Sequence, residues 1–102
     1  EIHAVIGIRY DDIAQMQSII EKVEKMLADH EHIAHDEPCR VYFDLFNASS
    51  LDFVIWAFST VTEGAEFKKI KGKLLLDVAD IIAEHGAEIA YPTQTLHIQK
   101  PA

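Results

Sequence analysis

The chain has 102 residues and a formal net charge of −8, with 49% hydrophobic and 25% charged residues. This length bounds it to a single domain, and the composition excludes an intrinsically disordered chain. The acidic excess argues against nucleic-acid binding and against adhesion to anionic lipid, since both require clustered positive charge. No apolar run approaches the roughly 20 residues that a membrane helix needs, so we expect no membrane insertion by this chain.

The chain begins inside an apolar run, with neither an initiator Met nor a signal peptide. We therefore interpret it as a piece of a longer protein. A single cysteine, Cys39, excludes an internal disulfide and suits a reducing compartment. We expect Cys39 to be a small packing residue.

The first half of the chain predicts a strand followed by a helix. His3–Tyr10 is apolar and β-branched, which is typical of a largely buried strand. Asp12 and Gln15 have the spacing of a capping box, which predicts that a helix begins there. Five apolar residues at helical spacing then form one stripe: Ile13, Met16, Ile20, Val23 and Leu27. The polar segment 29–38 is expected to be a connector.

Two alternating segments, 39–46 and 51–60, are joined by the turn 47–50 and predict a β-hairpin. One face of this hairpin is expected to pack on the helices. The other face carries large apolar residues: Tyr42, Phe46, Val54, Trp56 and Phe58. Because a water-exposed sheet face is usually more polar, we expect another domain or subunit to cover it. Ordinary exposure of single aromatic residues is the alternative.

A second helix is predicted from the apolar residues Phe67, Ile70, Leu74, Val78, Ile81 and Ile82. Gly86 follows where a left-handed C-terminal cap is needed, and 87–91 predicts a short strand that Pro92 ends. The order strand, helix, strand, strand, helix, strand predicts an α+β fold. Specifically, it predicts a ferredoxin-like βαββαβ two-layer sandwich with both helices on one face of a mixed or antiparallel sheet.

The sequence offers little evidence of chemistry. His30, His32, His35 and Asp36 are metal-ligand types at close spacing, but no cysteine pair or helical His-x3-His motif supports a zinc site. We favour a solvated connector there. The glycines are isolated, so no phosphate-binding loop is expected, and no nucleophile motif is present. We expect no catalytic residue, no cofactor and no metal.

Three segments together resemble the cytoplasmic C-terminal α/β domain of the small-conductance mechanosensitive channel (MscS) family. They are Val5–Asp12 (VIGIRYDD), Phe46–Phe53 (FNASSLDF) and Gly86–Thr95 (GAEIAYPTQT). The family often ends in IPFPQ where this chain has IAYPTQ, which leaves the subfamily open. The resemblance covers nearly the whole chain.

The resemblance implies a structural, non-catalytic module of a bacterial inner-membrane channel, on its cytoplasmic side. Family members are homoheptamers that release ions and small osmolytes on hypo-osmotic shock. Their membrane helices and a β domain precede this domain, which forms part of a vestibule wall. The implied domain is 1–94, and 95–102 would be an extended tail that starts an axial barrel strand. Tyr91, Pro92 and Gln94 join the aromatic hairpin face as candidate interface residues.

Two other functions remain open at this point. One is an amino-acid-sensing regulatory module of the ACT type, which has the same βαββαβ plan and binds a small molecule. The other is the cytoplasmic domain of a cation-efflux transporter, for which His30, His32 and His35 are the only support. Fold alone does not choose among them, because this plan serves many functions.

Overall fold

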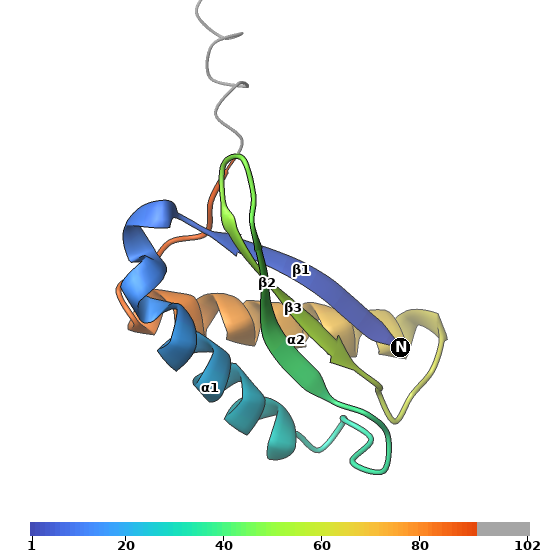
Figure 1. Cartoon of the computed structure of the whole chain (residues 1–102). Helices are drawn as coiled ribbons and strands as arrows, with labels where there is room; N and C mark the ends of the chain where they lie inside the picture. The colour runs from blue at the N-terminus through green and yellow to red at the C-terminus, as the bar shows by residue number, and fades with distance from the viewer. Residues whose placement is uncertain (92–102) are drawn as a thin grey trace, which may run out of the picture.

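The computed structural model describes residues 1–91 as an α+β sandwich of two layers (Figure 1). The strands are β1 (Ile2–Ile8), β2 (Arg40–Phe46) and β3 (Leu51–Ala57). The helices are the 3₁₀ helix η1 (Tyr10–Gln15), α1 (Met16–Ala28) and α2 (Gly64–Glu84). The three strands form one antiparallel sheet in the order β1-β3-β2, and both long helices cover the same face of it. The expected fold class is confirmed.

The core lies between the sheet and the two helices. On β1, the even-numbered residues from Ile2 to Ile8 point toward the helices, as the period of a strand requires. The central strand β3 contributes Leu51, Phe53 and Ile55, all fully buried. The helices contribute residues at helical spacing: Met16, Ile19, Ile20, Val23, Leu27, Leu74, Val78, Ile81 and Ile82. Most of the predicted helical stripes therefore form the core.

The predicted fourth strand, 87–91, is reduced to a single bridge. Ile89 is the antiparallel partner of Ile8, at the edge of β1 that faces away from β3. Two backbone hydrogen bonds flank this bridge, from Arg9 N to Glu88 O (3.1 Å) and from Ala90 N to Gly7 O (2.9 Å). The chain thus reaches the free edge of β1 but forms no strand there within the described residues.

The predicted capping box at Asp12 is wrong. The structure begins this region with η1, and α1 starts only at Met16, with no capping bond from the Asp12 side chain. The Asp12 carboxylate instead binds Arg9 and the backbone of Glu88. Ile13, expected on the buried stripe, is consequently exposed on η1.

A β-bulge corrects the predicted faces of the hairpin. The pairing shifts between Phe43 and Leu45, so that Leu45 lies opposite Asp52 and Phe46 opposite Leu51. One extra residue in β2 reverses the alternation beyond it. Phe46 therefore shares the side of buried Leu51 and contacts Phe43, with ring centroids 5.0 Å apart. Leu45 takes its place on the sheet face that points away from the helices.

Helix α2 ends as predicted, with Gly86 in the left-handed region at φ 75°. Replacing Gly86 with Ala is expected to lower the free energy of unfolding by about 1–2 kcal/mol, because a Cβ is strained at positive φ. Gly72 lies inside the same helix, and a Cβ there would meet nothing within 4 Å. The matched variant Gly72→Ala should raise stability by about 0.5–1 kcal/mol. Urea unfolding of both variants checks this, and two changes of the same sign would contradict it.

Candidate functional site

The sheet face away from the helices carries both apolar and polar side chains, and no helix among residues 1–91 covers it (Figure 1). The register places Val5, Val54 and Tyr42 in one row across the three strands. Val54 on the central strand is only 3% exposed, whereas Val5 and Tyr42 on the edge strands are 56% and 44% exposed. With Leu45 and Trp56 these residues form what we call the open face. Exposed apolar side chains grouped in this way are typical of a contact surface.

Trp56 anchors one end of the open face. Its indole Nε1 donates a hydrogen bond to the Glu1 carboxylate (2.6 Å), and the Arg40 guanidinium carbon lies 5.5 Å from the ring centroid. Phe58 packs edge-on against the indole ring, with centroids 5.7 Å apart. The polar atom of Trp56 is therefore satisfied inside the domain, and part of its ring remains exposed.

Only some of the candidate interface residues share this surface. Tyr42, Val54 and Trp56 lie on it, and Phe58 adjoins Trp56. Phe46 does not, because the bulge in β2 places it on the same side of the sheet as Leu51. Tyr91 is exposed at the far end of the domain, beside Tyr10 and Ser49. Pro92, Gln94 and the tail 95–102 lie outside the described residues. Sequence reasoning did not assign Leu45 to this surface. The alternation of apolar and polar residues in β2 gives no sign of the bulge that places it there.

The three segments that carry the family resemblance meet at the far end of the sheet, which we call the junction. A Cβ on Gly7 would lie 2.9 Å from Ser50 Cβ, so β1 can approach the hairpin only because residue 7 has no side chain. The buried Asp52 carboxylate accepts hydrogen bonds from Ser50 Oγ (2.6 Å) and Asn47 Nδ2 (3.0 Å). The Tyr10 hydroxyl donates to the Asn47 carbonyl. The Asp52 contacts hold the hairpin tip together internally, and the Tyr10 bond ties the tip to η1, which follows β1.

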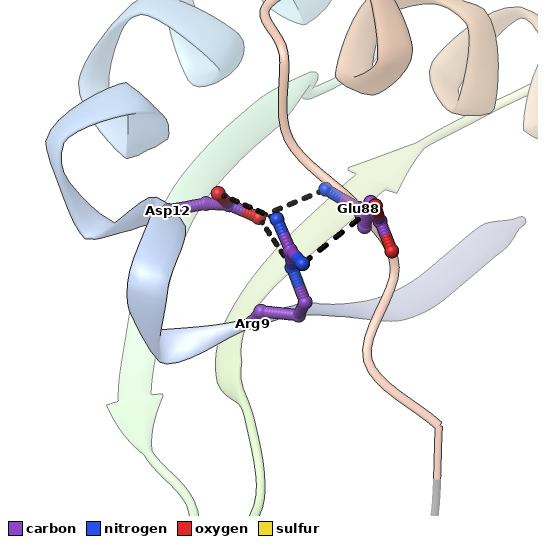
Figure 2. A network of polar contacts seen from close by, with 3 residues as sticks. All are labelled: Arg9, Asp12 and Glu88. Carbon is purple, nitrogen blue, oxygen red and sulfur yellow. Dashed lines mark hydrogen bonds and ion pairs between the residues drawn. The ribbon is translucent and has the colours of Figure 1, made fainter.

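The third segment enters the junction through a charged network (Figure 2). The Asp12 carboxylate accepts from Arg9 Nε (3.0 Å) and Nη2 (3.1 Å), and also from the backbone N–H of Glu88 (2.9 Å). Arg9 Nη1 lies 3.6 Å from the Glu88 carboxylate. Asp12 is only 7% exposed. The Arg9 hydrogen bonds, and then that of the Glu88 amide, hold the pKa of Asp12 below its ordinary value of 3.8.

The histidines of the connector do not converge. His30 Nδ1 accepts from the backbone N–H of His32 (3.1 Å), and His35 Nε2 lies 3.4 Å from the Leu27 carbonyl oxygen. No group of three or more potential metal ligands occurs among residues 1–91. The connector is also tied to the chain after β3 by the Ile33–Ser59 bridge, and Ile33 is buried.

Cys39 is exposed, so its predicted packing role is wrong. Partial desolvation, and then the charge of Glu24, raise the pKa of its thiol. No helix between residues 1 and 91 combines the length and the apolar character needed to cross a membrane.

Stability should depend on the ionised Asp12. Because its folded-state pKa is depressed, its contribution is fully present above the unfolded value and lost as the pH falls through the folded one. We expect Asp12→Asn to unfold at lower denaturant concentration at neutral pH, with a difference from the unmodified chain that closes as the pH falls through the lowered folded-state pKa of Asp12. Asp11→Asn, at an exposed neighbouring site, is the control. A gap for Asp12→Asn that stays constant with pH would contradict the assignment.

The comparisons with known proteins agree with one another. A family model described as "Mechanosensitive ion channel MscS, C-terminal" matches residues 2–89. The low conductance mechanosensitive channel YnaI of Escherichia coli is 37% identical over 97 residues, which is 95% of this chain and 28% of that protein. An uncharacterised MscS family protein of Aquifex aeolicus is 28% identical over 84% of this chain and 23% of its own length.

Among solved structures, the cryo-EM structure of Arabidopsis thaliana MSL1 has the same fold. It superposes with a TM-score of 0.76 and 20% identity, over 89% of this chain and 33% of that one. The chain therefore spans about a quarter to a third of the relatives it matches. Since the family model covers nearly all of it, the chain belongs to the MscS family of mechanosensitive ion channels and corresponds to their C-terminal domain.

Proposed function

We propose that this domain forms part of the cytoplasmic vestibule wall of a tension-gated channel in the bacterial inner membrane. The parent channel would release ions and small osmolytes after hypo-osmotic shock. Family membership supports the channel class, and YnaI, the matched relative from Escherichia coli, is itself a mechanosensitive channel. The domain would have a structural role without catalysis, as a part of the wall.

The observation that carries the proposal is the open face. An isolated domain gains nothing from the exposed apolar side chains of Val5, Tyr42 and Leu45, whereas a subunit of an assembly buries such side chains against a neighbour. We propose that the parent assembles as a homoheptamer in which this face contacts the adjacent subunit. A ring with an odd number of copies cannot use two-fold contacts, so the open face would meet a different patch of its neighbour.

The two ends of the domain suit a place within a longer chain. The chain enters β1 beside Trp56, and the last described segment lies at the opposite end of β1, where Ile89 pairs with Ile8 (Figure 1). We propose that membrane helices and a β domain precede residue 1. We also propose that 95–102 begin a strand of an axial barrel.

The assembly can be tested on the full-length parent protein. We expect it in the membrane fraction, and after detergent extraction we expect a mass of several copies. Leu45→Glu places a charge on the open face and should raise the dissociation constant of the assembly at least about tenfold, because buried interface charges without partners are costly.

Leu76→Glu is the matched control for this experiment. Leu76 is the same residue type and is 66% exposed on α2, compared with 43% for Leu45 on the open face. Leu76→Glu should therefore leave the mass unchanged. A soluble parent of the mass of one copy would contradict the channel function. An intact assembly with Leu45→Glu would contradict the role of the open face alone.

A further inference from the structure

The segment Ala87–Ala90 is attached to the sheet far more weakly than the other strands. β1 and β3 pair over seven residues, whereas this segment has the single bridge Ile8–Ile89 and two backbone hydrogen bonds. Its contribution to the core is the small side chain of Ala87, with Ile89 only partly buried. Few contacts would have to be lost for it to separate from β1.

The third hydrogen bond of this segment is made by a side chain in place of the backbone. A continued antiparallel ladder would pair the Glu88 N–H with the carbonyl of Arg9. That carbonyl is already used, because it accepts the N–H of Asp12 (3.0 Å) in the first turn of η1. The Asp12 carboxylate takes over as the acceptor for Glu88 N–H at 2.9 Å (Figure 2). One side chain thus supplies the attachment that a full strand would obtain from its backbone.

In the other direction, the sequence places a proline where a longer ladder would need a donor. The pairing of Ile8 with Ile89 puts Gly7 opposite Ala90, and the same register would put Val5 opposite position 92. The ladder would need an N–H there, and the residue is Pro92, which has none. Among the described residues, the attachment is therefore limited to a short length of β1 at the junction.

We propose that residues 87–91 act as a detachable strap, which opens from β1 while the three-stranded sheet and both helices stay folded, and that Asp12 sets how often it opens. The sheet can remain because β1 keeps its whole pairing with β3 when the strap leaves. Opening would change the direction in which the chain continues beyond Tyr91. This device belongs to the chain itself and does not depend on the proposed channel function.

Amide hydrogen exchange of the 102-residue chain, followed by NMR, tests the strap. The reporters are the amides of Arg9 and Ala90, which donate the two backbone bonds between strap and β1. A local opening exposes little surface, so their exchange should be nearly independent of low urea concentrations. Exchange of the amides that link β3 to its neighbours should instead become faster with urea. Without urea, these amides should exchange at least about tenfold more slowly than the two reporters.

Two variants separate strap opening from global unfolding. Asp12→Ala should accelerate exchange at Arg9 and Ala90 by about tenfold or more, because it removes a hydrogen bond to a charged acceptor. Asp11→Ala, at an exposed site beside it, should not. Gly72→Ala stabilises α2, so it should slow exchange in β3 and leave the two reporters unchanged.

The urea series on the unmodified chain decides the question even if Asp12→Ala does not fold. If the amides of Arg9 and Ala90 follow urea with the same slope as those of β3, the segment opens only with the whole domain, and the strap is overturned. The strap would also be overturned if Gly72→Ala slowed exchange at Arg9 and Ala90 as much as it slows exchange in β3. If Asp12→Ala folds and leaves exchange at Arg9 and Ala90 unchanged, the proposal that Asp12 sets how often the strap opens is contradicted.

Discussion

The architecture of this domain depends on the close approach of β1 to the β2–β3 hairpin at Gly7. The side chain of Ser50 occupies the space that any Cβ at position 7 would need. This approach brings Asp52 and its partners Asn47 and Ser50 against β1, and it places Asn47 within reach of the Tyr10 hydroxyl. The segment after α2 then meets β1 at the same end. One missing side chain thus allows three distant segments to form a junction.

Strand β1 connects the two ends of the domain that matter for a longer protein. At its start, Glu1 binds Trp56 on the open face, and at its end, Arg9 belongs to the charged network with Asp12 and Glu88. Between these points β1 pairs with the buried central strand along its whole length. It therefore runs from the entry of the chain to the segment at which the chain leaves the described residues.

The amino-acid sequence predicts the helices, and the helix end, that are determined by residues close together in the chain. The helical spacing of Ile70, Leu74 and Val78 is visible in the chain, and so is Gly86 as a helix end. Two features, the role of Asp12 and the bulge in β2, depend on residues in other segments of the chain. Asp12 has the spacing of a cap, but its carboxylate is claimed by an amide 76 residues away.

The bulge is the second feature that could not be predicted, and it matters for function. It follows from how β2 pairs with β3, and no residue between Phe43 and Leu45 signals it. A prediction based on strict alternation therefore assigns Phe46 to the open face and omits Leu45. Errors in assigning residues to a sheet face do not affect the recognition of the three family segments. That recognition depends on the identity, order and spacing of residues, and not on strand register. This is why the family could be inferred when part of the candidate interface was wrong.

The most direct test of the proposed function is a recording of tension-activated currents in the native host. Membrane patches from cells with and without the gene for the parent protein would be stretched by suction under identical conditions. The channel function predicts a conductance that opens with tension, is present with the gene, disappears when it is deleted and returns when it is restored. An identical set of tension-activated conductances in all three strains, with the parent protein present in the membrane, would contradict it.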